Sequence, residues 1–233
     1  MLDTKLVFSK NMNPHIKTDE LIRRLGGSKR QRLSRPLRTK LQNSIPKLRK
    51  IMKPRLFYHT KRIKLIEKGY VSLNEGPVFK SPKLARTLRD SEEVICFITT
   101  VGGEIDSEIN TMMRHGRLSE AYVLDALGSV AVESVAEKFH QYVETRCREE
   151  DKAVTLRFSP GYCDWPVVEQ KKLFGLFDSD MTGIQLQDSC LMMPRKSISA
   201  VFGLYPVADN LPPAPGYNPC LDCSKIDCPA RRA

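Results

Sequence analysis

The sequence lacks the long apolar run of a membrane-spanning helix. Its 233 residues have a hydrophobic content of 41%, and no segment approaches the roughly 20 consecutive apolar residues that a bilayer requires. The first residues, Met-Leu-Asp-Thr-Lys-Leu, lack the apolar stretch of a signal peptide. No internal repeat of 20–50 residues is visible either. We therefore expect a soluble, cytoplasmic protein.

Cysteine usage argues against a disulfide framework. The chain has seven cysteines, an odd number, and no export signal accompanies them. Because structural disulfides are rare in a reducing cytoplasm, reduced thiols or metal ligands are the expected states.

Acidic residues are scarce in the first 64 positions. This segment holds 19 Lys or Arg and 3 Asp or Glu, a net charge of +16, whereas residues 65–233 hold 19 and 24, a net charge of −5. Such a basic segment suits a nucleic acid, an acidic partner protein or a solvated helix face. It carries few aromatic residues and no recognisable nucleic-acid-binding motif, so nucleic acid is the least favoured partner.

The hydrophobic pattern predicts one α+β domain. Extended segments are expected at 20–27, 55–60, 62–67, 70–73, 94–101, 154–158, 184–190 and 197–204. Helices are expected at 28–52 (broken or kinked by Pro36 and Pro46), 81–90, 105–116, 118–148 and 165–178. We further expect residues 184–190 and 197–204 to form a hairpin. Because strands and helices alternate irregularly, the sheet should be central and largely antiparallel, with flanking helices.

Three parts of the chain differ in composition. Residues 1–18 are predicted to be an irregular lead-in, and residues 19–206 the α+β domain, in which 28–64 is strongly basic. Residues 207–233 are a proline-rich linker followed by a cysteine-rich tail.

The segment 157–166, Arg-Phe-Ser-Pro-Gly-Tyr-Cys-Asp-Trp-Pro, is expected to connect a strand to a helix through a tight turn. Pro160 fixes one φ angle, and Gly161 can adopt a positive φ. A turn of this kind can present backbone N–H groups to a ligand, with Arg157 and Tyr162 beside it. A plain connection without ligand is the alternative.

Three motifs resemble one family in order and spacing. They are Leu127-Gly-Ser-Val-Ala-Val-Glu133 with its helix as far as His140, Arg157-x3-Gly161-Tyr162-x3-Pro166, and Met193-Pro194-x2-Ser197-Ile-Ser199. They resemble the S-adenosylmethionine-binding activation domain of cobalamin-dependent methionine synthase, in particular its stand-alone members. The resemblance covers residues 90–205 and extends more loosely over 19–89.

The resemblance implies a repair function without a catalytic side chain. In that enzyme, cobalamin is occasionally oxidised to inactive cob(II)alamin, and one-electron reduction coupled to methyl transfer from S-adenosylmethionine restores methylcobalamin. A stand-alone domain implies a partner that is a cobalamin-binding protein or a methionine synthase without its own activation domain. It also implies an electron donor such as a flavodoxin or ferredoxin.

The resemblance also implies binding residues. Arg157 matches the arginine that binds the donor's carboxylate, a task suited to two parallel N–H donors. Pro160, Gly161 and Tyr162 match the turn that contacts the donor. Glu133 matches an acidic residue facing the donor's cationic side.

A second acidic position is assigned to Asp151, with Glu150 as the substitute. The family commonly has a Cys-Pro pair where this chain has Trp165-Pro166, and here the cysteine comes earlier, at Cys163.

The C-terminal cysteines predict a metal centre. Cys220, Cys223 and Cys228 are spaced to wrap a zinc ion or an iron–sulfur cluster, and no histidine lies nearby. The fourth ligand would be Cys163, Cys190 or a partner's residue. A flexible reduced tail is the alternative.

Two other functions remain open. The chain could bind a corrinoid protein or deliver electrons through a metal centre in the tail, without a methyl-donor site. A basic nucleic-acid binder is supported only by residues 1–64.

Overall fold

The centre of the fold is strand β5 (Glu93–Thr100), which is covered on both faces. The computed structural model describes residues 5–6, 14–26, 34–207, 217–221 and 223–224. Ile95 and Phe97 point into one hydrophobic cluster, while Val94 and Cys96 point into another. A strand covered on both faces has no polar side, and this explains its continuous apolar sequence.

The described strands form a main sheet in the order β4-β3-β2-β5-β9-β6, with β1 beside β2. All of these pairings are antiparallel. Around β5 the strands are β1 (Lys5–Leu6), β2 (Arg55–Glu67), β3 (Tyr70–Leu73), β4 (Val78–Lys80), β6 (Lys152–Val154) and β9 (Ser197–Pro206). The predicted α+β fold, with a central and largely antiparallel sheet flanked by helices, is confirmed.

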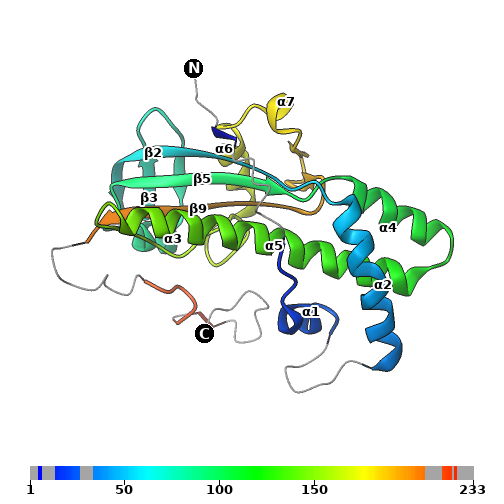
Figure 1. The fold of residues 1–233 in the computed structure, drawn as a ribbon. Helices are drawn as coiled ribbons and strands as arrows, with labels where there is room; N and C mark the ends of the chain where they lie inside the picture. Colours follow the sequence, from blue (N-terminus) through cyan, green and yellow to red (C-terminus); the bar gives the residue numbers. More distant parts are fainter. Residues whose placement is uncertain (1–4, 7–13, 27–33, 208–216, 222, 225–233) are drawn as a thin grey trace.

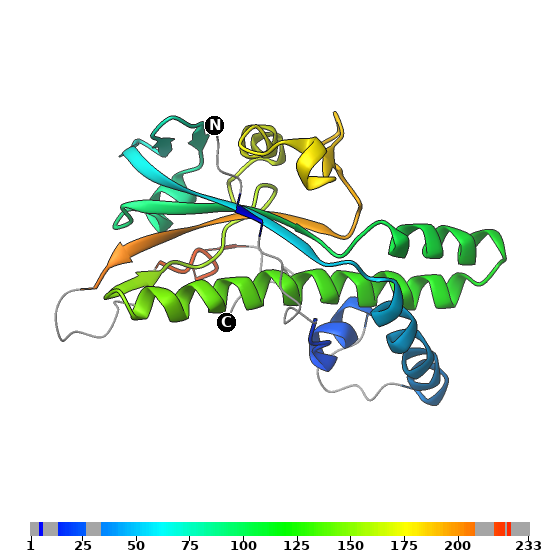
Figure 2. The ribbon, with the colours of Figure 1, turned by 45° about the horizontal axis from the view of Figure 1, so that its top comes forward.

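Helix α5 (Leu118–Arg148) covers one face of this sheet. Its 31 residues correspond to a length of roughly 46 Å, so it runs along the sheet and continues past its end (Figure 1). Helices α1 (Thr18–Arg24), α2 (Arg35–Ile51) and α4 (Glu104–Arg114) pack against α5 (Figures 1 and 2). Together they bury the larger hydrophobic cluster, in which Phe139 of α5 is fully inaccessible.

The opposite face is covered by shorter elements (Figure 2). These are α3 (Pro82–Thr87), the 3-10 helix η1 (Val167–Glu169), α6 (Gln170–Phe174) and α7 (Ser179–Thr182). Leu84, Trp165 and Leu173 fill the second cluster together with Phe79. Among the described residues, no helix combines the length and apolar character needed to cross a bilayer.

The N-terminal segments differ from the sequence prediction in three ways. Residues 20–27 were expected to be a strand, but Thr18–Arg24 is helix α1, because Leu21 and Leu25 are spaced by one turn and the terminal charges complement the helix dipole. Pro46 does not break α2, which continues to Ile51. The expected irregular lead-in contains the two-residue strand β1.

The two extended pieces expected at 55–60 and 62–67 form the single strand β2. Its pairing with β5 is unbroken from Arg55 to Arg62, and the register then shifts where the partner becomes β3. A change of partner thus accounts for the irregular sequence pattern, without a turn.

The last part of the domain corrects two further predictions. The expected helix at 165–178 is divided into η1 and α6, since Trp165 is drawn into the core and Gly175 ends α6. The expected hairpin of 184–190 with 197–204 does not form. Instead β7 (Gln185–Leu186) pairs with β8 (Met192–Met193), and β9, buried on both faces, lies between β5 and β6.

Candidate ligand-binding site

Arg157 and Glu133 meet at the surface of α5. The Nη2 atom of Arg157 lies 3.2 Å from Oε2 of Glu133 and 3.7 Å from Oε2 of Glu137. The arginine side chain is only 12% exposed, whereas the two glutamates are 31% and 39% exposed. The guanidinium is therefore held in place, and both carboxylates remain accessible to a ligand.

Helix α1 adds two more charges to this cluster. Arg24 Nη2 lies 3.8 Å from the other oxygen of Glu133 and 3.5 Å from Glu20. Helix α1 is fixed against α5 by hydrogen bonds from the His15 N–H to Ser134 Oγ and from the Tyr122 hydroxyl to the Arg24 carbonyl. We call Glu20, Arg24, Glu133, Glu137 and Arg157 the charged cluster. Its formal net charge is −1.

The turn after Arg157 is held by its own hydrogen bonds. The N–H of Gly161 donates to the carbonyl of Trp165 (2.8 Å), and that of Trp165 donates to Tyr162 (3.1 Å). Gly161 has φ +89, which requires glycine. Since these N–H groups bond within the turn, the exposed Tyr162 side chain is better placed than the backbone to meet a ligand.

Trp165 is a core residue of this chain. Its ring is 1% exposed and packs at 5.2 Å from Phe79 and 6.0 Å from Phe158. Asp164 binds α3, with Oδ1 accepting from Ser81 Oγ and Oδ2 from the Lys83 N–H. Both residues thus fix the turn to the second hydrophobic cluster.

His140 ends the motif of α5 that carries the resemblance, but the sequence assigned it no role. Its Nε2 is 2.8 Å from the carbonyl oxygen of Thr155, so this nitrogen carries the proton. Burial lowers the pKa of the His140 imidazole, and the positive charge of Arg157 lowers it further. The ring is therefore a neutral hydrogen-bond donor that supports the segment leading to Arg157.

The other predicted binding residues lie in different surroundings. Asp151 occupies an exposed turn after α5 with φ +53, and its carbonyl accepts from the Val207 N–H. Pro160 is buried beneath the turn. Cys163 is exposed, whereas Cys190 is buried. Cys220 and Cys223 are partly exposed, and Cys228 lies outside the described residues.

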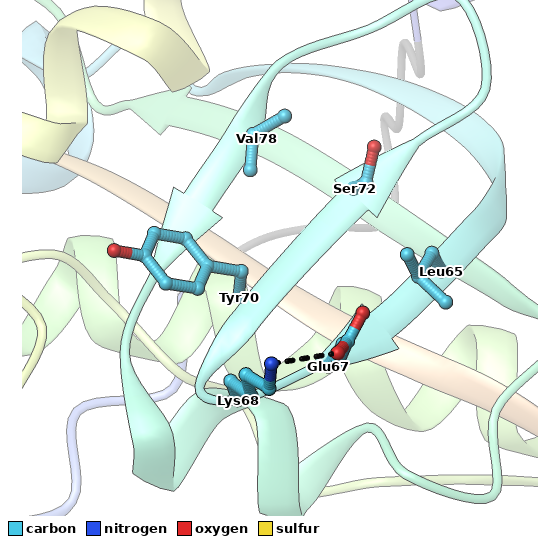
Figure 3. A pocket seen from close by; sticks show the side chains of 6 residues that line it. All are labelled: Leu65, Glu67, Lys68, Tyr70, Ser72 and Val78. Atoms are coloured by element: carbon cyan, nitrogen blue, oxygen red, sulfur yellow. Dashed lines mark ion pairs between the residues drawn. The ribbon is translucent and has the colours of Figure 1, made fainter.

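A shallow hollow elsewhere on the surface contains none of these residues. It lies over β2, β3 and β4 and is lined by Leu65, Glu67, Lys68, Tyr70, Ser72 and Val78 (Figure 3). The ion pair in Figure 3 joins the exposed side chains of Glu67 and Lys68 at 3.4 Å. This hollow has no convergent set of charges like that around Arg157.

Three members of the charged cluster were missed in the sequence. Glu137 could have been predicted from the sequence, because it follows Glu133 by one helical turn and therefore lies on the same face of α5. Glu20 and Arg24 could not have been predicted, because their position depends on how α1 packs against α5.

The family can now be assigned. The family model described as vitamin B12-dependent methionine synthase, activation domain, matches residues 84–212. The chain belongs to this family. The match includes Glu133, Arg157 and the turn to Pro166, whereas α1, α2 and the cysteine tail lie outside it.

A solved structure agrees with the assignment to the activation-domain family. The crystal structure of the MetH reactivation domain bound to AdoHcy is similar with a TM-score of 0.67 and 17% sequence identity. The alignment covers 90% of this chain and 81% of that one. At this level of identity the likeness establishes a shared fold. No curated protein sequence matches this chain.

Proposed function

We propose that the chain is a stand-alone reactivation subunit that binds S-adenosylmethionine at the charged cluster. The observation that carries this proposal is the contact between Arg157 and Glu133, within the part of the chain that matches the activation-domain family. The related reactivation domain binds AdoHcy, the product that remains when S-adenosylmethionine gives up its methyl group.

Arg157 is assigned to the ligand's carboxylate. Nη2 donates one hydrogen bond to Glu133, so its second N–H can form a parallel pair with the N–H of Nε or of Nη1 for a carboxylate. Because the glutamates already order this guanidinium, binding does not have to immobilise a mobile arginine, and the entropic cost is smaller.

The carboxylates are assigned to the cationic part of the ligand. S-adenosylmethionine carries an ammonium, a sulfonium and a carboxylate, a net charge of about +1, which complements the net charge of the cluster. Glu133 and Glu137 face this part directly, and Glu20 adds to the field. Tyr162 is assigned to the adenosine ring, and Asp151 to a secondary acidic contact.

The partner is a protein that carries cobalamin. The cobalamin of such a partner would supply a reduced cobalt as the methyl acceptor, and the donor would leave this chain's site as AdoHcy. This chain's residues hold the sulfonium in place and supply no proton. The electron comes from a separate donor such as a flavodoxin or ferredoxin.

Calorimetry on the full chain tests the methyl-donor site. We expect S-adenosylmethionine to bind and Arg157→Ala to weaken binding at least tenfold, because a charge-assisted pair contributes about 1.5–3 kcal/mol. Arg148→Ala is the matched control, since Arg148 is an exposed arginine whose partner is Glu144 on the same helix. The Arg148→Ala variant should bind S-adenosylmethionine with the same affinity as the unaltered chain.

Two outcomes would overturn the proposal. One is the absence of binding, and the other is equal affinity of the Arg157 and Arg148 variants. If the chain bound a corrinoid protein without binding the methyl donor, the second candidate function, corrinoid binding or electron delivery, would replace the first.

A further inference from the structure

The carboxylate of Glu133 is shared by two arginines from different elements. Nη2 of Arg24 lies 3.8 Å from Oε1 of Glu133, and Nη2 of Arg157 lies 3.2 Å from Oε2. Arg24 belongs to α1, which lies outside the residues matched by the family model. One oxygen of a carboxylate assigned to the ligand is therefore occupied by a positive charge of the chain itself.

Arg24 is held less firmly on Glu133 than Arg157. The side chain of Arg24 is 38% exposed and its distance to Glu133 is at the long end of the range for an ion pair, whereas Arg157 is 12% exposed and donates a hydrogen bond. Because ion pairs that water reaches contribute little, a ligand's cation can replace Arg24 at a small cost.

Arg24 also has a second partner on its own helix. Its Nη2 lies 3.5 Å from Oε1 of Glu20, one turn earlier in α1. The backbone of α1 is fixed independently, since the Tyr122 hydroxyl donates to the Arg24 carbonyl and Leu21 is buried. A rotation of the Arg24 side chain toward Glu20 therefore frees the oxygen of Glu133 without moving the helix.

We propose that Arg24 is a specificity-determining residue of the ligand site. In the free chain its guanidinium occupies the position on Glu133 that the ligand's ammonium takes in the complex, and on binding it turns toward Glu20. This inference rests on the proposed function, because it takes as ligand an S-adenosyl compound with an α-amino acid group.

Such an exchange selects ligands by their amino acid end. The carboxylate of that end binds Arg157 while its ammonium takes the position of Arg24, so that both charged contacts form together. A nucleoside without the amino acid group, such as 5′-methylthioadenosine, has no ammonium to replace Arg24. The presence of Arg24 should therefore affect the binding of the amino acid end and not that of the nucleoside.

Calorimetry on the full chain with S-adenosylmethionine, AdoHcy and 5′-methylthioadenosine tests the inference. Arg24→Gln removes the competing charge and keeps the backbone contact with Tyr122. We expect this variant to bind S-adenosylmethionine and AdoHcy about threefold more tightly, and 5′-methylthioadenosine as weakly as the unaltered chain does. Arg23→Gln is the matched control, since Arg23 is an exposed arginine in the same turn of α1, and it should change none of the three affinities.

AdoHcy distinguishes this exchange from a general effect of charge. AdoHcy lacks the sulfonium and has no net charge, so the loss of a distant positive charge strengthens S-adenosylmethionine alone, whereas the loss of a competitor for Glu133 strengthens both ligands.

Glu20→Gln provides a second measurement with the opposite sign. It removes the alternative partner of Arg24, so AdoHcy should bind about twofold more weakly. In the Arg24→Gln background the same change should leave AdoHcy binding unaltered, because Glu20 acts on this ligand through Arg24.

The outcomes separate this inference from the proposed function. Equal AdoHcy affinity of the unaltered and Arg24→Gln chains would overturn the inference and leave the methyl-donor site intact. A gain for S-adenosylmethionine alone, or an equal gain in Arg23→Gln, would overturn it as well, since Arg24 would then act only through its charge. If neither the unaltered chain nor Arg24→Gln bound any of the three compounds, the proposed function itself would be overturned, and this inference with it.

Discussion

At the scale of single residues, Arg157, the group proposed to bind the ligand's carboxylate, is already ordered by its neighbours on α5. Glu133 and Glu137, one turn apart on α5, both contact its Nη2 atom. Glu133 also faces Arg24, so its two oxygens are shared between two guanidinium groups. The ammonium of the proposed ligand must compete with these two arginines for the oxygens of Glu133. When the ligand's carboxylate binds Arg157, this arginine interacts less strongly with Glu133, and the ammonium can bind Glu133 more easily.

This arrangement predicts a selective effect of Glu133→Gln. The change removes one negative charge from the cluster, so it should weaken S-adenosylmethionine, with its sulfonium charge, more than the uncharged thioether AdoHcy. We expect losses of roughly tenfold and roughly threefold, measured by calorimetry. Glu144→Gln, which affects an exposed pair on the same helix, should change neither. Equal losses for both ligands would show that Glu133 does not sense the sulfonium.

His140 predicts a dependence of stability on pH. Because burial lowers its pKa in the folded chain below the ordinary value of 6.5, the unfolded chain binds a proton more readily. The free energy of unfolding should therefore fall as the pH drops below about 6.5, and this contribution should be complete above it.

Urea unfolding at about pH 7.5 and about pH 5.5 measures this effect. His140→Gln keeps a donor for the Thr155 carbonyl and cannot titrate, so it should lose less stability between the two conditions. His115→Gln is the control, since this exposed histidine lies at the end of α4. An unchanged pH dependence in the His140 variant would contradict the prediction.

At the scale of elements, α2 shows how tertiary packing overrides a local cost. Pro46 lies inside this helix, where it lacks an N–H and crowds the preceding turn. The helix continues because Leu41, Ser44 and Leu48 are buried against the rest of the domain. Six residues of α2 are basic and none is acidic.

Replacing Pro46 should therefore stabilise the protein. We expect Pro46→Ala to raise the free energy of unfolding by about 1–3 kcal/mol, since it restores a hydrogen bond and removes a clash. Pro36→Ala is the matched control, because Pro36 lies in the first turn, where its N–H has no helical partner. Denaturant unfolding compares the two, and a stabilisation no greater for Pro46→Ala than for Pro36→Ala would contradict the prediction.

At the scale of the whole molecule, charge is divided between a basic N-terminal part and a mildly acidic remainder. Helix α2 alone carries six basic residues. Lys40 donates a hydrogen bond to Ser119, and Lys47 forms an ion pair with Glu108. Arg49 and Lys50 lie exposed at its end. We propose that this surface binds an acidic cobalamin-carrying domain.

Charge reversal tests this docking surface. Arg49→Glu combined with Lys50→Glu should weaken binding to the corrinoid partner about tenfold at low salt, and the difference should shrink above about 0.5 M salt. Arg146→Glu combined with Arg148→Glu, at the end of α5, is the matched control. Equal effects of the two pairs would remove α2 from the interface. Binding of the unaltered chain to DNA or RNA instead of a corrinoid protein would favour the nucleic-acid alternative.

The sequence predicted correctly those elements that show a regular local pattern of apolar residues. Helix α5 was predicted within its observed bounds, because its apolar residues recur every three or four positions without an interrupting proline. The buried strand β5 followed from its apolar run. Glu133 and Arg157 were assigned through the resemblance to the activation-domain family, and the structure brings them into contact.

Contacts between residues far apart in the chain depend on the tertiary structure. The sequence could not reveal that Arg24 reaches Glu133, that β9 pairs with β5 instead of forming a hairpin, or that Lys83 bonds both Asp164 and Pro219. Each of these contacts depends on packing between segments that are separated by many residues. The local helix or strand propensity of a segment does not say which other segment will pack against it. The amino-acid sequence was sufficient to assign the family and to predict helix α5, strand β5 and the charged residues proposed for binding. Which residues surround the proposed binding residues depends on how the helices pack against the sheet.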